Sequence, residues 1–281
     1  MVSLLLKKQV RTILEQHGSD SAAFETEQIL KWATGFDRLT LTPDSEIDDE
    51  KAKTAIDAAK RRVKGEPLQY ILGEWDFFGL TFHVGEGVLI PRPETELLVE
   101  KTLEELKNGG TVIDLCSGSG CIPIAVSKKS GASCYGIEIS EKALEYFKEN
   151  IILNNVEDSV TPLCGDVLNP SDTLLERLPE KCDIITANPP YLTADDMREL
   201  QKEVRHEPEI ALFGGTDGLD FYRVIFGKWK KRLAENGEFI VETGDHQAEA
   251  IREIMEKEGF SCEIINDYNK IGRFVFGKLA S

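Results

Sequence analysis

The chain has 281 residues, of which 41% are hydrophobic and 30% are charged, with 23 glycines and 11 prolines. This composition predicts a globular protein of about two domains and excludes a collagenous or wholly disordered chain. Acidic residues outnumber basic residues by 50 to 33, which gives a net charge of −17. Because a negative field repels phosphate, this charge disfavours a nucleic-acid target, which would need a local basic patch.

The cysteines and the start of the chain indicate a cytoplasmic protein. None of the six cysteines lies in a Cys-x-x-Cys pair, and no histidine pair accompanies them at zinc spacing. We therefore expect reduced, structural thiols and no metal site. The first residues lack the order of a signal peptide, and no stretch approaches the roughly 20 apolar residues of a membrane span. We expect no membrane contact.

The first 72 residues predict a small bundle of three helices. Apolar residues recur at helical spacing in three segments, which are 4–14, 24–33 and 47–63. We expect the third helix to begin at Pro43–Ser45. The segment 70–88 is rich in aromatic residues and is interrupted by glycines, which predicts a β-hairpin that turns near Gly79 and joins the bundle to the rest of the chain.

From about Gly110 strands and helices alternate, which predicts an α/β domain with a mostly parallel sheet and helices on both faces. The predicted strands are 111–115, 133–139, 160–164, 183–187, 238–242, 262–265 and 273–276. The predicted helices are 121–128, 141–155, 222–233 and 247–258. We expect the last two strands to pair as an antiparallel hairpin at one end of the sheet.

Three strand ends predict a nucleoside site. The first strand runs into the turn Cys116-Ser117-Gly118-Ser119-Gly120, whose glycines let the backbone turn tightly and approach a ligand. Glu138 ends the second strand, where an acid can accept hydrogen bonds from both ribose hydroxyls. Asp166 follows the third strand, where it could meet an adenine amino group. Because these ends share the carboxyl edge of the sheet, we expect one adenosine site.

Two cofactors fit such a site, a dinucleotide and S-adenosylmethionine. A dinucleotide turn has a third glycine, which lets the helix N-terminus lie close to the pyrophosphate. Pro123 stands at that position here. Proline is acceptable in a first helical turn, but it is unusual in a dinucleotide turn. The sequence therefore favours S-adenosylmethionine.

The fourth strand ends in Asn188-Pro189-Pro190-Tyr191. The prolines lack N–H donors, so the backbone carbonyls there act as pure acceptors. Asn188 adds a side-chain carbonyl and Tyr191 adds a flat ring. Acceptors at Asn188 and Pro189 suit a planar –NH2 group conjugated to a π system, because they align its nitrogen with a sulfonium methyl group. They would also stabilise the positive charge that develops on this nitrogen.

These motifs resemble those of the class I amino-methyltransferases. Within that class the chain is similar to the peptide chain release factor glutamine methyltransferases, the PrmC/HemK family. Further segments that carry the resemblance are Gly65–Gly73, Ile90–Glu96, Glu207–Gly215 and Asp217–Tyr222.

The resemblance implies a Rossmann-like, seven-stranded class I methyltransferase domain at 90–281. It also implies a helical substrate-recognition domain at 1–72 and a β-hairpin linker at 73–89. The implied cofactor is S-adenosylmethionine, with S-adenosylhomocysteine as product. The expected cofactor-binding residues are Cys116, Ser117, Gly118, Ser119, Gly120, Glu138, Asp166, Val167 and Asn188.

Three of these positions depart from the family pattern. Cys116 stands where glycine is frequent, and it is still a small residue. Glu138 stands where aspartate is common, and it still supplies a carboxylate. Val167 stands where some relatives place a tryptophan, which removes ring stacking against the adenine.

The implied reaction methylates the side-chain amide of the glutamine in a release factor's Gly-Gly-Gln loop. Asn188, Pro189 and Tyr191 are the expected catalytic residues, and Asn188, Pro189, Pro190 and Tyr191 the expected substrate-binding residues. The N-terminal bundle would bind another part of the release factor.

Three other functions remain open. An adenine-N6 methyltransferase of nucleic acid meets the same chemistry, but it needs a flipped base and a basic track. The dense basic clusters here are 60–62 and 228–232, and we expect no direct contact with nucleic acid. A glutamine methyltransferase of a ribosomal protein would differ mainly in the N-terminal domain. A non-enzymatic nucleoside-binding module would have no use for the Asn188–Tyr191 turn.

Overall fold

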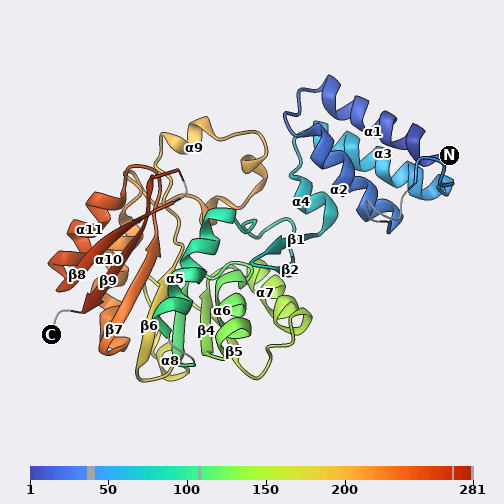
Figure 1. Cartoon of the computed structure of the whole chain (residues 1–281). Helices are drawn as coiled ribbons and strands as arrows, with labels where there is room; N and C mark the ends of the chain where they lie inside the picture. The colour runs from blue at the N-terminus through green and yellow to red at the C-terminus, as the bar shows by residue number, and fades with distance from the viewer. Residues whose placement is uncertain (37–41, 107–108, 268, 280–281) are drawn as a thin grey trace. The chain divides into compact units, whose positions relative to one another are not determined.

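The computed structural model of the chain describes residues 1–36, 42–106, 109–267 and 269–279. They form two compact units, each with its own core (Figure 1). The first unit is Met1–Glu74 with Gln201–His206, and the second is Trp75–Leu200 with Glu207–Ser281. The chain therefore contributes to the first unit twice.

The first unit is a helical bundle. Its described helices are α1 (Ser3–Gln16), α2 (Ala22–Thr34), α3 (Asp49–Val63), α4 (Leu68–Leu72) and the 3₁₀ helix η2 (Val204–His206). α1, α2 and α3 pack against one another. The face of α3 in the core consists of alanines, which let the neighbouring helices come close. The buried side chains of the bundle include Leu6, Val10, Leu14, Ile29, Leu30, Ala52, Ala55 and Ala59.

The predicted start of the third helix was wrong. α3 begins at Asp49, and the Asp48 side chain caps it by accepting a hydrogen bond from the Glu50 N–H at 2.8 Å. The residues at 43–45 instead pair with the start of the chain. The Ser3 N–H donates to the Ser45 carbonyl and the Leu4 N–H to the Pro43 carbonyl, so these carbonyls satisfy the first N–H groups of α1.

An ion-pair cluster holds the segment Gln201–His206 in the first unit. Arg62 donates to Glu25 at 2.8 Å and also to Glu203. Burial alone would lower the pKa of Arg62, but the hydrogen bonds to the two carboxylates outweigh it and raise the pKa. The partly buried guanidinium needs these partners, because an unpaired charge there would be costly.

A short hairpin opens the region after the helices. It consists of β1 (Glu74–Phe77) and β2 (Leu80–His83), joined by Phe78 and Gly79, which both have positive φ. Two consecutive residues with positive φ are typical of the two-residue turn that joins the strands of a tight hairpin. The predicted hairpin is confirmed, and Phe77 and Phe82 lie in the core of the second unit.

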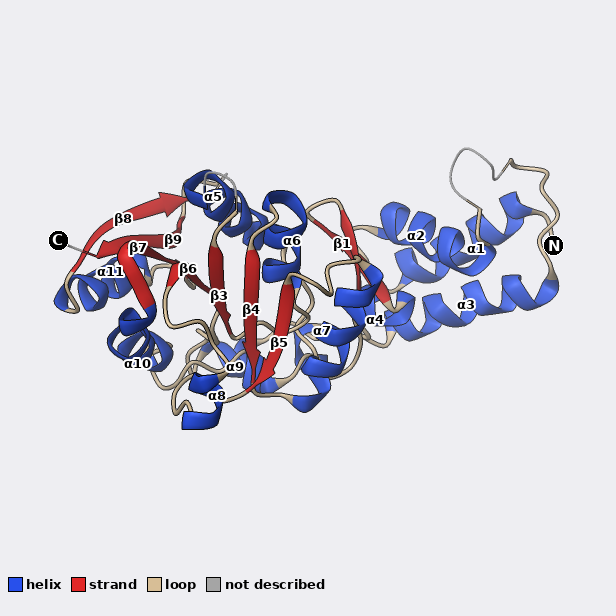
Figure 2. Cartoon of the chain, turned by 90° about the horizontal axis from the view of Figure 1, so that it is seen from below, coloured by secondary structure: helices blue, strands red, loops and turns tan. Residues whose placement is uncertain are grey.

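The second unit contains a seven-stranded sheet in the order β5-β4-β3-β6-β7-β9-β8. Figure 2 shows β3, β4 and β5 side by side. The strands are β3 (Thr111–Leu115), β4 (Ser133–Glu138), β5 (Val160–Cys164), β6 (Cys182–Ala187), β7 (Leu233–Glu242), β8 (Phe260–Asn266) and β9 (Gly272–Leu279). The first five are parallel, and β9 is antiparallel to β7 and β8. The predicted fold class is confirmed, including the terminal hairpin at one end of the sheet.

Helices cover both faces of this sheet. Val112 of β3 shares one core with α5 (Glu96–Leu106), α6 (Cys121–Ser130) and α7 (Glu141–Leu153). Its neighbour Ile113 shares the other core with α8 (Asp172–Glu176), α10 (Asp220–Trp229) and α11 (Ala248–Lys257). Successive residues of a strand point to opposite faces, so each strand contributes to both cores. Helix α5 is one element that the sequence analysis missed.

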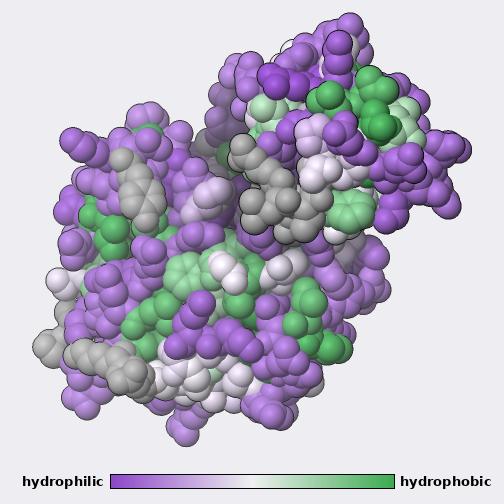
Figure 3. Space-filling view, turned by 45° about the vertical axis from the view of Figure 1, so that its right-hand side comes forward, coloured by the Kyte–Doolittle hydropathy of each residue, from purple (hydrophilic) through white to green (hydrophobic). Residues whose placement is uncertain are grey.

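Shorter elements complete the described part of the chain. They are the 3₁₀ helices η1 (Pro93–Thr95), η3 (Glu209–Ala211) and η4 (Lys230–Arg232), and the helix α9 (Asp196–Glu199). The face shown in Figure 3 is mostly hydrophilic, with smaller groups of hydrophobic side chains. Among the described residues, no helix has the length and apolar character needed to cross a membrane.

The second unit should fold without the first 74 residues, because all seven strands and both cores of the sheet lie within it. A fragment of residues 75–281 should unfold cooperatively on heating when followed by circular dichroism. The segment Gln201–His206 then lacks Arg62, so trypsin should cleave after Lys202 or Arg205 faster in the fragment than in the full chain. A non-cooperative melting curve would contradict this division of the chain.

Candidate functional site

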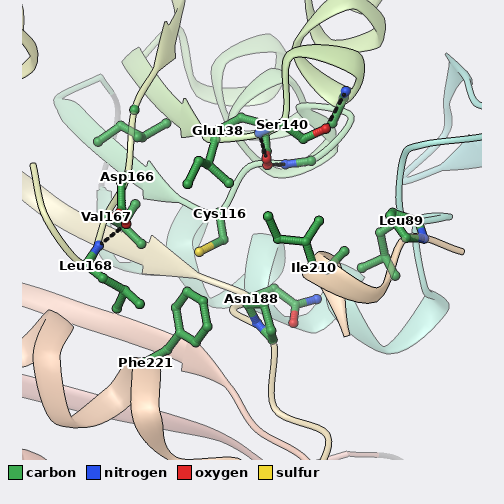
Figure 4. A pocket seen from close by; sticks show the side chains of 18 of the residues that line it. Leu89, Cys116, Glu138, Ser140, Asp166, Val167, Leu168, Asn188, Ile210 and Phe221 are labelled. Atoms are coloured by element: carbon green, nitrogen blue, oxygen red, sulfur yellow. Dashed lines mark hydrogen bonds between the residues drawn. The ribbon is translucent and has the colours of Figure 1, made fainter. Parts of the chain in front are cut away.

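A cavity of about 260 Å³ lies at the carboxyl edge of the sheet. Four adjacent strands, β5, β4, β3 and β6, each contribute a side chain to it from their carboxyl end or from the segment that follows (Figure 4). These side chains are Asp166, Glu138, Cys116 and Asn188. Its other walls are mainly apolar and include Leu89, Val167, Leu168, Ile210 and Phe221. A concave apolar site with a few convergent polar groups is the usual form of a small-molecule site.

The turn between β3 and α6 forms one wall of the cavity. Cys116, Gly118 and Gly120 all have positive φ, at 61°, 54° and 79°. A Cβ atom on Gly120 would lie 2.0 Å from the Phe147 ring, so only glycine fits there. Cys116 carries the cost of a left-handed side-chain-bearing residue, about 1–2 kcal/mol. This backbone conformation explains why glycine suits the position of Cys116.

Glu138 is the last residue of β4 and is 8% exposed. One carboxylate oxygen accepts from the Gly118 N–H at 2.8 Å, and the other accepts from the Ser140 N–H at 2.7 Å. Burial raises the pKa of Glu138, and these two N–H groups partly offset the effect. Each oxygen keeps a second lone pair. The carboxylate can therefore still accept two hydrogen bonds from a diol in the cavity.

The segment after β5 forms the opposite end of the site. One Asp166 carboxylate oxygen accepts from the Leu168 N–H at 2.8 Å, which fixes a tight local turn. The Val167 carbonyl accepts from the Trp229 indole N–H at 2.9 Å, and its side chain is buried against the cavity. Val167 therefore offers a planar ligand an aliphatic contact, whereas an aromatic residue at this position would stack on it.

The turn after β6 presents Asn188 to the cavity. The Asn188 side-chain N–H group donates to the Thr95 hydroxyl at 3.2 Å. Thr95 in turn donates to the Glu242 carboxylate at 2.6 Å. Burial, followed by the nearby Glu242 carboxylate, raises the pKa of Tyr191, which keeps its hydroxyl neutral. The Tyr191 carbonyl accepts from the Gln247 side chain at 2.9 Å.

The structure brings the predicted site residues to one edge of the second unit, though not all of them line the cavity. The predicted residues that line it are Cys116, Gly118, Glu138, Asp166, Val167, Asn188 and Pro190. The others lie in the same two turns without lining it, and they are Ser117, Ser119, Gly120, Pro189 and Tyr191. Their roles remain predictions.

Sequence reasoning missed three polar residues beside the site. Thr95 lies in a segment that only the family resemblance singled out. Glu242 ends β7, as Glu138 ends β4. The rule that identified Glu138, an acid at a strand end, could therefore have identified Glu242. Asp114 is fully buried in β3, two residues before Cys116.

Asp114 has an incomplete set of hydrogen bonds. One carboxylate oxygen accepts from the Thr186 hydroxyl at 2.6 Å, and the other has no hydrogen-bond partner among the described residues. Burial raises the pKa of Asp114 to about 7. A cationic group near the turn would stabilise the ionised form.

Comparisons with known proteins place the chain in a family. Residues 6–73 match the family model of the PrmC N-terminal domain, and residues 98–207 match that of the TRM5/TYW2 methyltransferase domain. The release factor glutamine methyltransferase of Thermodesulfovibrio yellowstonii is 42% identical over 257 residues, which cover 89% of this chain and 90% of that relative. The protein of the same name from Geobacter sulfurreducens is 38% identical, with 96% and 94% covered.

The chain belongs to the release factor glutamine methyltransferase family. Among solved structures, a methyltransferase from Pyrococcus furiosus is 18% identical, with a TM-score of 0.57 over 73% of this chain and 91% of that one. At this identity the likeness supports the fold alone. The family resemblance and the methyltransferase class predicted from the sequence are thus confirmed, and the chain is an enzyme of this family.

Replacing Asp114 should change how stability depends on pH. The folded-state pKa of about 7 lies above the ordinary value of 3.8, so the unfolded chain loses this proton first as the pH rises. Asp114 therefore lowers the stability of the unliganded wild type progressively between about pH 4 and pH 7. The free energy of unfolding of Asp114→Asn, measured relative to that of wild type, should therefore be roughly 3 kcal/mol higher at pH 8 than at pH 5.

Urea denaturation at both pH values measures this difference. Asp195→Asn, which changes an exposed aspartate in the same unit, is the control. A difference between Asp114→Asn and wild type that stays constant with pH would show that Asp114 ionises normally in the folded protein.

Proposed function

We propose that this protein transfers the methyl group of S-adenosylmethionine to the side-chain amide nitrogen of the glutamine in the Gly-Gly-Gln motif of peptide chain release factors. The observation that carries the proposal is the Asn188-Pro189-Pro190-Tyr191 turn, which follows a central strand and presents Asn188 to the cavity. The names of the relatives, release factor glutamine methyltransferase, support this substrate.

The residues that line the cavity fit S-adenosylmethionine. The Glu138 carboxylate would accept from the two ribose hydroxyls, and the backbone of Gly118 offers a close approach that a side chain would block. Asp166 and Val167 would contact the adenine, the first as a polar acceptor and the second as an apolar wall. When bound, the cofactor supplies an electrophilic methyl group on a sulfonium.

The residues after β6 would hold the target nitrogen. The lone pair of an amide nitrogen is delocalised into its carbonyl, so this nitrogen is a weak nucleophile. The Asn188 side-chain oxygen and the Pro189 carbonyl would accept its two N–H bonds and orient the nitrogen toward the methyl group. They would also stabilise the positive charge that develops as the N–CH3 bond forms and the S–CH3 bond breaks. The proton can leave to solvent afterwards, so no separate base is required.

We further propose that the helical unit, predicted as domain 1–72, binds a second part of the release factor, with the hairpin 73–89 as linker and 90–281 as the catalytic domain. The net charge of −17 suits a basic partner. A cytoplasmic location stays a prediction, consistent with six free cysteines.

The basic clusters support a protein substrate over a nucleic acid. Arg61 pairs with Glu66, and Arg62 with Glu25 and Glu203. In the second cluster Lys228 donates to the Leu168 carbonyl, Lys230 to Glu258 and Arg232 to the Pro179 carbonyl. These cations are already engaged within the chain, so they offer a poor track for a phosphate backbone.

The proposed function is tested by incubating the protein and S-adenosylmethionine with an intact release factor. Mass spectrometry should find one added methyl group on the glutamine of the Gly-Gly-Gln motif. A release factor in which glutamate replaces that glutamine is the matched control. Methylation of a ribosomal protein or an oligonucleotide, with the release factor unmodified, would overturn the proposed substrate.

Glu138→Ala should weaken S-adenosylmethionine binding by about 1.5–3 kcal/mol, the range for hydrogen bonds to a charged group. Isothermal titration calorimetry measures this affinity. Glu141→Ala is the control, because Glu141 is an exposed acid near Glu138 that does not line the cavity. Equal affinities for Glu138→Ala and wild type would remove Glu138 from the cofactor site.

Asn188→Ala should lower kcat by about 10²–10³-fold, the range for one preorganised contact to developing charge. The affinity for S-adenosylmethionine should fall much less, since the other strand ends supply most of the proposed cofactor contacts. Single-turnover methylation of the release factor separates the two effects. Near-wild-type turnover of Asn188→Ala would contradict the proposed mechanism.

A further inference from the structure

A buried hydrogen-bonded chain leads away from Asn188 to a carboxylate that the proposed reaction does not use. Thr95 and Glu242 are 2% and 1% exposed. The Thr95 hydroxyl donates to Glu242 at 2.6 Å and accepts from the Asn188 amide nitrogen at 3.2 Å. Thr95 comes from η1, Asn188 from the turn directly after β6, and Glu242 from the end of β7.

The direction of this chain follows from the protons available. A threonine hydroxyl has one proton to donate, and an ionised carboxylate can only accept. When Glu242 is ionised it accepts the hydrogen bond that the Thr95 hydroxyl donates, so the Thr95 oxygen can only accept from Asn188. The Asn188 nitrogen must then face Thr95, which leaves its carbonyl oxygen free for the cavity. A reversed amide would set the Asn188 oxygen against a hydroxyl oxygen with no proton left to share.

We propose that Thr95 and Glu242 are positioning residues, which hold the Asn188 side chain with its oxygen toward the target nitrogen. The proposal deepens the proposed function and rests on it for the identity of the target. The orientation of the Asn188 amide does not depend on that target, because it is set by hydrogen bonds within the protein. An amide turned the other way would present its NH2 to the target NH2, so two donors would meet.

The segment that carries Thr95 is itself braced. Two prolines, Pro91 and Pro93, restrict the backbone before Thr95. Glu207 accepts from the Ile90 N–H at 3.0 Å and from the Arg92 guanidinium at 2.5 Å. The Glu242 backbone is also fixed, because its carbonyl accepts from the Tyr222 hydroxyl at 2.6 Å. The two residues that orient Asn188, Thr95 and Glu242, are therefore themselves held in place.

The charge on Glu242 sets the direction. Burial raises the pKa of Glu242 to about 7, while the Thr95 hydrogen bond and Arg273 lower it, Glu94 raises it and Arg92 lowers it. The other titratable groups near the carboxylate are Tyr191, Tyr222 and Cys121. A protonated Glu242 can donate to Thr95, which frees the Thr95 proton for the Asn188 oxygen and reverses the chain. Activity should therefore rise as the pH increases through about 7.

Thr95→Val tests the proposal, because it removes the hydroxyl and keeps the branched shape. We expect kcat for release factor methylation to fall about 10–100-fold, with the affinity for S-adenosylmethionine within twofold of wild type. Thr95→Ser should restore most of kcat. Thr102→Val is the matched control: Thr102 is equally buried, but its hydroxyl bonds the Leu98 carbonyl within α5. Wild-type kcat in Thr95→Val would overturn the proposal.

Two further measurements separate positioning from stability. In the Asn188→Ala background Thr95→Val should cause no additional loss of kcat, because it acts through Asn188; a full additional loss would overturn the proposal. Glu242→Gln should remove the rise of kcat near pH 7, since a glutamine amide can donate or accept. A rise that persists in Glu242→Gln would exclude Glu242 as its source. This variant also tests the chain of hydrogen bonds if Thr95→Val fails to fold.

Nuclear magnetic resonance of the free protein gives a readout that needs no substrate. The side-chain NH2 signal of Asn188, assigned by its loss in Asn188→Ala, should exchange slowly with water in wild type. It should shift and exchange faster in Thr95→Val, and an unchanged signal would overturn the proposal. If wild type shows the expected signal but does not methylate a release factor, the proposed function fails and the positioning stands. If wild type methylates and Thr95→Val does so equally, the positioning fails alone.

Discussion

The site depends on one constraint, the common direction of the parallel strands. Because β3 to β7 run the same way, their carboxyl ends share one edge, and each places a polar or turn-forming residue there. Glu138 and Glu242 end their strands, and Asn188 follows another directly. The residues are far apart in sequence, yet the common direction and register of the strands bring them together. This explains why the edge binds ligands in open α/β sheets generally.

Burial at this edge makes the polar groups effective and costly at once. Burial raises the pKa of Asp114 and of Glu242 to about 7, so the fold loses stability when they ionise. The cost is tolerable because neighbouring hydroxyls donate to each carboxylate, Thr186 to Asp114 and Thr95 to Glu242. Groups held in this way need no reorganisation when charge develops beside them, which is the basis of electrostatic preorganisation.

The sequence predicted features that depend on local pattern and missed those that depend on distant partners. The strands 111–115 and 160–164 were predicted to the residue, because buried strands between turn signals give a clear pattern. The predicted start of α3 was wrong, because the carbonyls of Pro43 and Ser45 accept hydrogen bonds from the first N–H groups of α1. The chain of Thr95 and Glu242 was invisible for the same reason, because its members meet only through the fold.

In the proposed reaction, the orientation of Asn188 suits a planar NH2 group but does not select the molecule that carries it. A glutamine amide and an adenine amino group present the same two donors, so Asn188 and Pro189 would hold either one. Selection must come from groups that contact the rest of the substrate. The apolar wall residues Leu89 and Ile210 suit the narrow aliphatic stem of a glutamine. The engaged basic clusters disfavour a nucleic acid. In the proposed function, therefore, the residues at the sheet edge determine the reaction, and the apolar cavity wall and the helical unit determine the substrate.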